Sequence, residues 1–521
     1  MQGFAWDVPA RLNMARQVCD DWAQLDPDRV AILDLSQGRQ VISYGALRAM
    51  ADRLAHQLRA QGVQVGDRVA VLRPQSAWTA AAHIAIWKLG AVSVPLFTLF
   101  GPDALELRLK DAGVRIVVTD PTPPSALASW LAAEAGHCAL APETLPANNT
   151  VFDPVETGPD DPAVLIYTSG TTGAPKGALH GHKILLGHLP GVEMSHNFLG
   201  APEDCLWTPA DWAWIGGLFD VLMPGLALGV PVVARRFDKF TAEAAIETIA
   251  QGRVRNVFLP PTALRMMRAA GVTAPGLRSV ASGGESLGAE MLDWGRAAFG
   301  LTINEFYGQT ECNMVASSCA DLFDPRAGAI GKPVPGFDLA VLDDDGQPIS
   351  QDGTEGDIAL HRGTPSMMLH YWNRPDATAE KFKGDWMLTG DRGFWRDGFI
   401  HFKGRDDDVI SSAGYRIGPT EIEDCLLKHP AVASAGVIGV PDDLRGQIVV
   451  AYVTLRAGFA PDGDLAAELQ AFARTQGAAH SYPRKIEFTD ALPMTVTGKV
   501  IRADLRRWAA AAAEENKAPL R

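Results

Sequence analysis

The sequence has few cysteines, and none of them form a metal-binding or redox pattern. The six cysteines, at positions 19, 138, 205, 312, 319 and 425, are scattered, and none belongs to a CxxC pair. Such a set gives no zinc signature and is typical of a reducing compartment. We therefore expect neither a disulfide framework nor a cysteine-based zinc site.

The sequence also lacks an uninterrupted apolar run long enough to cross a membrane. Its most apolar stretch, residues 79–100, is broken by His83, Lys88, Gly90 and Pro95, which favours a buried helix followed by a strand. The first nine residues, MQGFAWDVP, contain neither a basic segment nor an apolar core, so nothing indicates export. We expect a cytoplasmic protein without stable membrane insertion.

An excess of positive charge is missing as well. The chain has 47 lysines and arginines against 61 aspartates and glutamates, for a net charge of −14. This balance argues against a nucleic-acid or anionic-membrane partner, although a local basic pocket for a phosphorylated ligand remains compatible with it. A length of 521 residues with 47% hydrophobic and 21% charged residues indicates a soluble globular protein of at least two domains.

Helical and strand patterns alternate along the first part of the chain. Amphipathic helices are predicted at 44–61 and 77–89, and strands at 68–72, 91–95 and 114–119. Strands separated by helices predict a parallel, doubly wound α/β sheet. Residues 121–161 are predicted to form a linker with one short helix. A second helix-and-strand unit of the same kind is predicted after it, with strands at 230–233, 257–261 and 277–282.

The pattern changes at about residue 330. Short alternating strands with tight turns predict a small antiparallel β subdomain at about 330–405. A compact tail follows, with helices predicted at 419–428 and 465–475, strands at 435–439 and 448–455, and a closing loop at 493–499. We therefore predict an N-terminal domain of residues 1–405 and a C-terminal domain of residues 406–521.

A phosphate-binding loop is predicted at Tyr167-Thr-Ser-Gly-Thr-Thr-Gly-Ala-Pro-Lys176-Gly-Ala-Leu-His180, directly after an apolar strand. Glycines expose backbone N–H groups, hydroxyls add donors, and Lys176 supplies the cation that a polyphosphate needs. The loop is not a Walker motif, because Lys176 is preceded by Pro175 and followed by Gly177. A flexible surface turn is the alternative interpretation.

Two further clusters carry residues suited to a nucleotide, and the first of them follows the strand predicted to end at residue 282. Gly283-Gly284-Glu285-Ser286 would let a flat ring lie against the chain, or would be a plain turn capped by Ser286. Asn304-Glu-Phe-Tyr-Gly-Gln-Thr-Glu311 offers Tyr307 for stacking on adenine, Thr310 for the α-phosphate and Glu311 as a hard ligand for Mg²⁺. In the alternative, Tyr307 is a packing residue and Glu311 lies on a solvated helix.

Three clusters occur in the last quarter of the chain. Leu388-Thr-Gly-Asp391 ends a strand with an aspartate suited to ribose hydroxyls. The charged, glycine-rich segment from Gly404 to Glu421 lies at the predicted domain boundary, where the alternative is a solvated linker. Pro493-Met-Thr-Val-Thr-Gly-Lys499 closes the tail; taken alone, its lysine would be an idle surface residue.

Together, in this order and spacing, these clusters resemble the AMP-forming acyl-CoA synthetases of the adenylate-forming (ANL) superfamily, most closely the medium-chain branch. The similarity extends from about Val30 to Arg506. It implies two doubly wound αβα subdomains and a small distorted β-barrel in the N-terminal domain, followed by a small mobile α+β domain. The implied ligands are ATP, Mg²⁺, coenzyme A and a carboxylic acid.

The resemblance also implies site residues. Nucleotide contacts are expected from the phosphate loop (Thr168, Ser169, Gly170, Thr171, Thr172, Gly173 and Lys176), from Gly283, Gly284, Glu285 and Ser286, from Glu305, Phe306, Tyr307, Gly308, Gln309 and Thr310, and from Asp391, Arg405, Arg416 and Lys499. Lys499, Thr310, Glu311 and Lys176 are the implied catalytic groups, Glu311 the metal ligand and Asp407 the hinge. Coenzyme A is expected at Gly414, Tyr415 and Arg474, with Arg484 and Lys485 as further candidates for its phosphates.

The size of the acid is indicated by five positions, Trp214, Ile215, Gly216, Gly283 and Gly308. In acetate-specific relatives a tryptophan follows the residue corresponding to Tyr307, whereas this chain has Gly308. Small residues in an apolar wall predict a short-to-medium-chain or aromatic acid larger than acetate. The alternative is that neighbouring side chains refill the space.

The implied reaction has two steps, adenylation of the acid and transfer of the acyl group to coenzyme A, with the tail rotating about Asp407 between them. An adenylation enzyme that loads a carrier-protein phosphopantetheine, a luciferase-like oxygenase and a non-catalytic nucleotide-binding protein are the alternatives. A homodimer, and a lysine acetyltransferase or deacetylase acting on Lys499, are candidate partners. The sequence does not give the preferred acid or the oligomeric state.

Overall fold

The structure is a computed structural model, and it describes residues 3–36, 38–147, 150–168, 175–237, 239–284, 287–405, 408, 410–412, 415–442, 446–476, 482–495 and 498–515. The chain forms two compact units. The first comprises the described residues of 1–168, 175–339 and 360–387, and the second those of 340–359 and 388–515. The predicted boundary at residues 405 and 406 remains a proposal.

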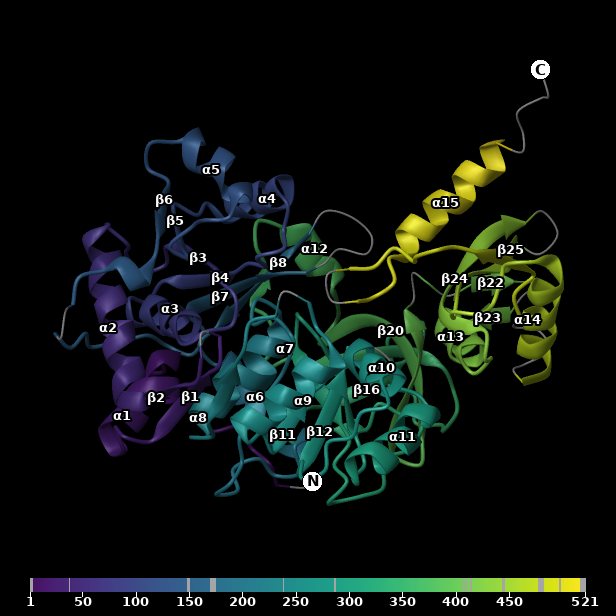
Figure 1. Cartoon of the computed structure of the whole chain (residues 1–521), viewed down its shortest axis with the longest axis horizontal. Coiled ribbons are helices and arrows are strands. Elements are labelled where there is room, and N and C mark those ends of the chain that lie inside the picture. Colours follow the sequence, from purple (N-terminus) through teal and green to yellow (C-terminus); the bar gives the residue numbers. More distant parts are fainter. Residues whose placement is uncertain are drawn as a thin grey trace. The chain divides into compact units, whose positions relative to one another are not determined.

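The first unit contains a seven-stranded sheet in the order β18-β8-β7-β4-β3-β5-β6 (Figure 1). Its strands are β3 (Arg68–Leu72), β4 (Val92–Pro95), β5 (Ile116–Thr119), β6 (Cys138–Leu140), β7 (Pro162–Tyr167), β8 (Gly177–Gly181) and β18 (His370–Tyr371). The strands from β7 to β6 run parallel, and β8 pairs antiparallel with both β7 and β18.

Helices cover both faces of this sheet because alternate strand residues point to opposite sides. Val69 and Val71 pack with α2 (Tyr44–Ala60) and α3 (Ala77–Lys88). Ala70 and Leu72 pack with α4 (Pro102–Ala112) and α5 (Ala128–Ala133). α2 and α3 begin at N-cap serines whose side chains accept a backbone N–H in the first turn. The predicted doubly wound arrangement is therefore confirmed.

A nine-stranded sheet of the same unit has the order β15-β14-β13-β12-β11-β9-β10-β1-β2. Its strands are β1 (Val30–Asp34), β2 (Gln40–Ser43), β9 (Leu206–Trp207), β10 (Val232–Ala234), β11 (Asn256–Phe258), β12 (Ser279–Gly283), β13 (Asn304–Gln309), β14 (Asn313–Ser317) and β15 (Lys332–Pro333). The strands from β13 to β1 are parallel, and the edge strands are antiparallel.

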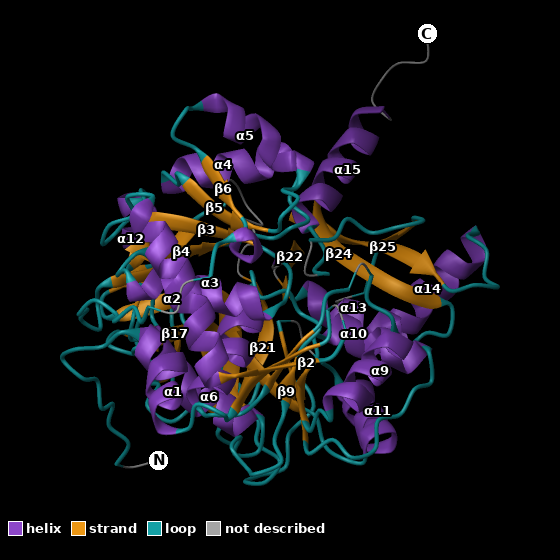
Figure 2. Cartoon of the chain, turned by 60° about the vertical axis from the view of Figure 1, so that its left-hand side comes forward, coloured by secondary structure: helices purple, strands orange, loops and turns teal. Residues whose placement is uncertain are grey.

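Three helices pack on one face of the nine-stranded sheet through one apolar cluster. Figures 1 and 2 show these helices next to one another. They are α9 (Ala242–Gly252), α10 (Pro261–Ala269) and α11 (Ala289–Phe299). The remaining helices of the unit are η1 (Arg16–Asp20), α1 (Asp21–Leu25), η2 (Ser125–Leu127), η3 (Pro142–Thr144), α6 (Ile184–Ser195), α7 (Ile215–Gly217), η4 (Leu218–Leu222), α8 (Met223–Ala227) and α12 (Pro375–Glu380).

The strands predicted at about 330–405 form a five-stranded sheet in the order β16-β17-β20-β19, with β21 paired to β20. They are β16 (Leu339–Leu342), β17 (Gly356–His361), β19 (Phe382–Lys383), β20 (Trp386–Arg396) and β21 (Phe399–Arg405). The C-terminal part adds a fourth sheet, formed by β22 (Ile410–Ser412), β23 (Tyr415–Ile417), β24 (Val432–Asp442), β25 (Gly446–Leu455) and β26 (Lys485–Phe488). Its helices are α13 (Pro419–Leu427), α14 (Gly463–Gln476) and α15 (Arg502–Glu515).

The mixed α/β class and the order of most elements were predicted correctly, but the segment 121–161 was not. It was expected to be a linker with one short helix, yet its strand β6 joins the edge of the seven-stranded sheet by pairing with β5. β6 is only three residues long and half-buried, so it gives little hydrophobic signal.

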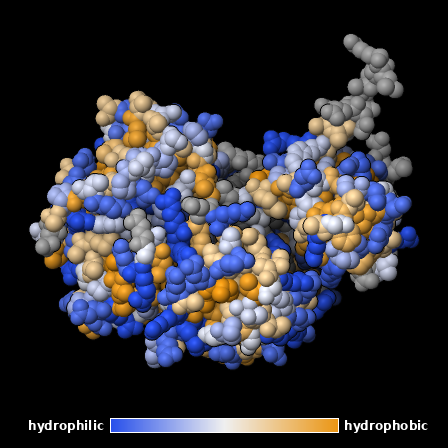
Figure 3. Space-filling model, viewed as in Figure 1, coloured by the Kyte–Doolittle hydropathy of each residue, from blue (hydrophilic) through white to orange (hydrophobic). Residues whose placement is uncertain are grey.

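The surface of the larger unit is mixed in character. Figure 3 shows hydrophilic residues spread over its visible face, with apolar residues in small groups between them. Among the described residues, no helix combines the length and the hydrophobicity needed to cross a membrane.

Candidate functional site

Predicted site residues of the first unit gather where parallel strands end. The predicted phosphate loop directly follows β7, which ends at Tyr167. The Gly283 cluster begins at the last residue of β12, and the cluster from Asn304 to Glu311 comprises β13 and the start of the turn after it. In α/β folds, ligands bind at the carboxyl ends of the strands. The sequence clusters therefore lie at strand ends of both large sheets, where folds of this class are expected to bind a ligand.

The predicted phosphate loop connects β7 and β8, and its two ends are held together. The backbone N–H of Thr168 donates to the carbonyl of Lys176 over 2.9 Å, and the Thr168 hydroxyl donates to the same carbonyl over 3.2 Å. Residues Ser169, Gly170, Thr171, Thr172 and Gly173 lie outside the described residues. The described ends thus fix where the loop leaves and rejoins the sheet, and the exposed Lys176 stands at its end.

Thr310 and Glu311 lie in the turn between β13 and β14, and contacts from distant segments fix this turn. Nε2 of His180 donates to the Thr310 carbonyl over 2.9 Å, and the backbone N–H of Met368 donates to the Glu311 carbonyl over 2.7 Å. The hydroxyl of Tyr371 donates to the carboxylate of Glu311. Burial lowers the pKa of His180 to about 3, so its ring is neutral at physiological pH.

Tyr371 also links this turn to the phosphate loop. The ammonium nitrogen of Lys176 lies 5.3 Å from the centroid of the Tyr371 ring, within the range of a cation–π contact. Nearby, the ammonium group of Lys381 donates to the Gln309 side-chain oxygen over 2.8 Å. Lys176 and Glu311 therefore both contact the side chain of Tyr371, Lys176 at the ring and Glu311 at the hydroxyl, and a second lysine, Lys381, contacts Gln309 of β13.

The predicted adenine-binding residues lie on β12 and β13. Glu305 is buried, and its carboxylate accepts the backbone N–H of Leu287 over 3.2 Å. Gly284 has φ of +101°, a conformation that side chains rarely adopt, so the chain turns sharply after β12. Tyr307 is half-buried, whereas Glu285 and Ser286 lie outside the described residues.

Aromatic rings occupy the space beside two of the glycines predicted to open the acyl pocket. A Cβ added to Gly216 would lie 2.9 Å from the Trp214 ring, and one added to Gly283 would lie 2.5 Å from the Phe306 ring. Phe258 connects the two rings, with its centroid 5.7 Å from that of Trp214 and 5.1 Å from that of Phe306. At these positions neighbouring side chains fill the space, as the alternative interpretation proposed.

Gly308 has a different environment. A Cβ added there would lie 1.8 Å from the backbone oxygen of Asn313, because the register between β13 and β14 shifts between Tyr307 and Gly308. The strand pairing itself therefore requires a glycine at this position. Its small size alone does not demonstrate an open pocket. Ile215, the fifth predicted residue of the acyl wall, is buried.

In the second unit, Asp391 and Arg405 are directly paired across β20 and β21. Asp391 is buried and Lys499 half-buried. The backbone N–H of Lys499 donates to the Thr495 hydroxyl over 3.0 Å, and the N–H of Thr495 donates to the Lys499 carbonyl over 2.8 Å. These bonds close the predicted lysine loop into a tight turn.

The predicted coenzyme A residues are described only in part. The guanidinium groups of Arg474 and Arg484 lie 5.7 Å and 4.1 Å from the centroid of the Tyr482 ring, and Lys485 forms an ion pair with Glu487. The following parts lie outside the described residues: Asp407, Gly414, and the side chains of Arg405, Tyr415 and Arg416.

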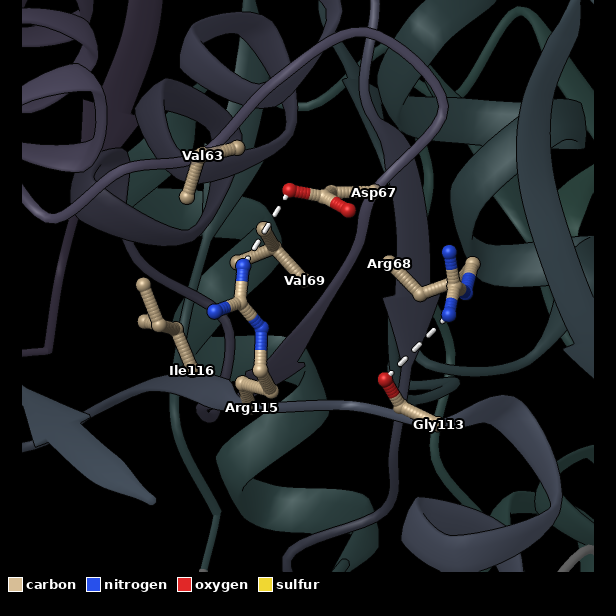
Figure 4. A pocket seen from close by; sticks show the side chains of 7 residues that line it. All are labelled: Val63, Asp67, Arg68, Val69, Gly113, Arg115 and Ile116. Atoms are coloured by element: carbon tan, nitrogen blue, oxygen red, sulfur yellow. Dashed lines mark hydrogen bonds and ion pairs between the residues drawn. The ribbon is translucent and has the colours of Figure 1, made fainter. Parts of the chain in front are cut away.

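The described residues of the first unit line at least two hollows. One, of about 150 Å³, is bordered by Asp67, Arg68 and Arg115 at the amino ends of β3 and β5, and Figure 4 shows that Arg115 pairs with Asp67 and Arg68 with Gly113. It lies at the edge opposite the predicted clusters. The other, of about 390 Å³, is lined in part by Tyr371 and Arg374, so it adjoins the Glu311 turn.

Sequence reasoning did not assign a role to His180 or Tyr371. His180 ends the phosphate-loop stretch and would have been a reasonable candidate on proximity alone. Tyr371 is 60 residues from Glu311 and lies among ordinary packing residues, so no local signal marks it. Among the described residues, no group of three or more His, Cys, Asp or Glu side chains could hold a metal ion.

The fold and the residues at its strand ends define an α/β nucleotide-binding enzyme with a separate C-terminal unit. Residues 19–372 match the family described as AMP-binding enzyme, and residues 421–499 match the AMP-binding enzyme C-terminal domain. The chain belongs to this family of ATP-dependent, AMP-forming acyl-CoA ligases.

Individual relatives share the whole architecture. The chain is 33% identical to the acetyl-coenzyme A synthetase of Bacillus subtilis (strain 168) and 33% identical to the mitochondrial acyl-coenzyme A synthetase ACSM2B of Homo sapiens. Each alignment covers 96% of this chain and 91% of the relative. The solved structure of a benzoate CoA ligase from Burkholderia xenovorans LB400 has 28% identity and a TM-score of 0.83, covering 95% of this chain and 99% of that one. The predicted family is thus confirmed.

Proposed function

We propose that this chain joins a carboxylic acid to coenzyme A in two steps, through an acyl-adenylate. The observation that carries the proposal is the convergence of Lys176, Tyr371, Thr310 and Glu311 at the carboxyl ends of β7 and β13. This arrangement offers a cation, a hydroxyl-bearing residue and a buried carboxylate in one place. Transfer at a phosphorus atom depends mainly on such positioning and charge stabilisation.

In the first step the acid carboxylate attacks the α-phosphate of ATP, and pyrophosphate leaves. Both reactants are anions, so the protein must neutralise charge and align them. We assign the β- and γ-phosphates to Lys176 and the loop from Thr168 to Gly173, the α-phosphate to Thr310, and the adenine to Tyr307. Asp391 and Arg405, which are paired across β20 and β21, are assigned to the ribose.

The donor set agrees with a Mg²⁺ ion that arrives with the nucleotide. Glu311 is a buried carboxylate, and the described residues hold no larger ligand cluster. Mg²⁺ commonly binds through one or two carboxylates together with substrate phosphates. Glu311, held by Tyr371, would be its protein ligand. When bound, the ion would neutralise part of the phosphate charge.

We assign a further positive charge in the first step to Lys499, and the rotation between steps to the segment around Asp407. In the second step the thiol of coenzyme A attacks the acyl carbonyl and AMP leaves, so the lysine is no longer needed. The family relationship supports this division, and the closed turn around Lys499 is consistent with a defined position for its side chain. We also propose that the C-terminal domain begins at residue 406.

The acid is proposed to be a short-to-medium-chain fatty or aromatic acid larger than acetate. The support is the apolar character of the wall formed by Trp214, Phe258 and Phe306. Because the rings of Trp214 and Phe306 fill the space beside Gly216 and Gly283, the acid would contact flat ring surfaces instead of entering a slot lined by glycine. Each additional buried CH₂ group would contribute ~0.8 kcal/mol.

The test is to incubate the purified protein with ATP, Mg²⁺, coenzyme A and acetate, butyrate, hexanoate or benzoate, and to identify products by mass spectrometry. We expect equal amounts of AMP and acyl-CoA, with a larger kcat/KM for one of the last three acids than for acetate. Formation of ADP, or nucleotide hydrolysis without a thioester, would contradict the proposed reaction. A clear preference for acetate would contradict only the proposed acid class.

A further inference from the structure

Asp408 directly follows the proposed hinge residue, and two arginines of α15 hold its carboxylate. Nη2 of Arg506 donates to Oδ1 over 2.6 Å, and Nη1 of Arg502 donates to Oδ2 over 3.2 Å. The side chain of Asp408 is 8% exposed and that of Arg502 17% exposed. The pair of Asp408 and Arg502 is shielded from solvent and interacts more strongly than a surface ion pair, whereas the side chain of Arg506 is 36% exposed.

Arg502 also connects α15 to the core of the second unit. Its guanidinium donates to both carboxylate oxygens of Glu423 on α13, over 2.7 and 2.6 Å, and its Nε donates to the carbonyl of Val437 on β24. Burial alone would lower the pKa of Arg502. The negative charges and hydrogen bonds of Glu423 and Asp408 have the larger effect, so the pKa is raised. Arg502 therefore stays charged. The two positive charges of Arg502 and Arg506 match the two negative charges of Asp408 and Glu423.

The same helix begins three residues after Lys499. The turn that carries Lys499 is closed by the two Thr495 bonds and by the backbone N–H of Ile501, which donates to the carbonyl of Pro493 over 2.8 Å. No flexible spacer separates this turn from Arg502, the first residue of α15. The arginines on α15 thus connect the lysine turn to the residue beside the hinge.

We propose that Arg502 and Arg506 are positioning residues for Lys499, acting through Asp408. They fix the geometry between the lysine turn and the chain that leaves the hinge, so that rotation about residue 407 delivers Lys499 to a defined place in the adenylation step. This inference rests on the proposed function. If the cluster only stabilised the fold, its loss would affect both chemical steps alike.

The experiment uses the full-length protein with the variants R506M and D408N. R506M leaves the pair between Arg502 and Glu423 intact, so the core of the second unit is retained. R507M is the matched control, because Arg507 is on the same helix with a side chain that is 77% exposed and pairs with Asp504 instead. K499A is the reference variant, and R506K tests whether a charge alone restores the function.

Three quantities are measured for each variant: acid-dependent exchange of pyrophosphate into ATP, thioester formation from preformed acyl-adenylate, and Tm. We expect R506M and D408N to slow exchange by about 10- to 100-fold, as small misplacements of a reacting group do, and thioester formation by less than about 3-fold. R506K should recover part of the exchange rate. The double variant should be no worse than the stronger single one, because both changes disrupt the contact between Arg506 and Asp408.

A parallel loss of both steps together with a large fall in Tm would overturn the proposal in favour of a structural role. An unchanged exchange rate in R506M and D408N would also overturn it. So would an R507M variant that slows exchange but not thioester formation. The K499A reference separates this inference from the proposed function. If K499A itself fails to slow exchange selectively, the assignment of Lys499 is wrong; if only R506M and D408N fail to do so, the positioning role is wrong.

Discussion

The hydroxyl of Tyr371 donates a hydrogen bond to the carboxylate of Glu311, and both side chains are buried. The bond ties the short strand β18 to the turn after β13, although Tyr371 and Glu311 are 60 residues apart in the sequence. It holds one carboxylate oxygen in place and leaves the carboxylate with capacity for a second partner. Tyr371 therefore holds the carboxylate of Glu311 in a defined orientation.

Replacing Tyr371 with phenylalanine should weaken the use of Mg²⁺. The Y371F variant keeps the ring beside Lys176 but removes the donor to Glu311, and loss of such a supporting bond typically lowers metal affinity about 10-fold or more. We expect the Mg²⁺ concentration for half-maximal pyrophosphate exchange to rise by about that factor. Y452F, in which the altered tyrosine packs on Trp508 in the second unit, is the control. Equal Mg²⁺ titrations for Y371F and the unaltered protein would disprove the role of Tyr371.

An alanine at Gly308 should disrupt the turn that carries Thr310 and Glu311. Its Cβ would meet the backbone oxygen of Asn313, which cannot rotate away as a side chain can. We expect G308A to lower the free energy of unfolding by about 3 kcal/mol and to reduce exchange activity severely. G136A is a suitable control, since a Cβ there meets nothing within 4 Å. The measurement is denaturant unfolding alongside exchange, and a fully stable, active G308A would refute the account of this glycine.

Removing the Trp214 ring should change the acid preference. The W214A variant would free the space that the ring occupies beside Gly216, so two further CH₂ groups could be buried at ~0.8 kcal/mol each. This corresponds to a rise of roughly 10-fold in kcat/KM for hexanoate relative to butyrate. W508A, which removes a partly exposed tryptophan of the second unit, should leave the ratio unchanged. An unchanged ratio in W214A would show that the acid does not contact this wall.

Four buried histidines should make the protein sensitive to mild acid. Burial lowers the pKa of His83, His180 and His196 to about 3 and that of His182 to about 4, whereas the unfolded value is 6.5. Each depressed pKa favours folding above pH 6.5, and that contribution is lost as the pH falls toward 4 and 3. The unfolded chain therefore binds more protons in this window.

Between pH 6 and 5, each of these histidines should lower the free energy of unfolding by up to about 1.4 kcal/mol per pH unit. Urea unfolding at a series of pH values measures the slope. H83Q should reduce the slope by the contribution of one histidine, because glutamine does not bind a proton in this pH range. A slope that is unaffected by H83Q would contradict the assignment for His83.

Much of the architecture follows from local patterns in the sequence. α2 was predicted within one residue from its apolar spacing, and β3 was predicted without error. The candidate site residues came from the resemblance of the sequence clusters to a known family, and those of the first unit lie at strand ends of the two large sheets.

What the sequence could not supply are contacts between distant segments. The Tyr371 bond to Glu311 and the Phe306 ring against Gly283 depend on tertiary packing, so a glycine that suggests an open pocket can instead accommodate a neighbouring ring. The sequence likewise suggests that Gly308 is a small residue of the pocket. The close approach of the Asn313 backbone is sufficient to explain why this position is a glycine. β6 was missed because pairing with β5, and not its own hydrophobicity, makes it a strand.

The most direct test of the central claim is exchange of labelled pyrophosphate into ATP by the unaltered protein without coenzyme A. If the chain forms an acyl-adenylate, label should enter ATP only when Mg²⁺ and a suitable carboxylic acid are both present. Exchange without any acid, or an absolute requirement for coenzyme A, would contradict a free acyl-adenylate intermediate. No exchange across the series acetate, butyrate, hexanoate and benzoate would contradict the proposed substrate class.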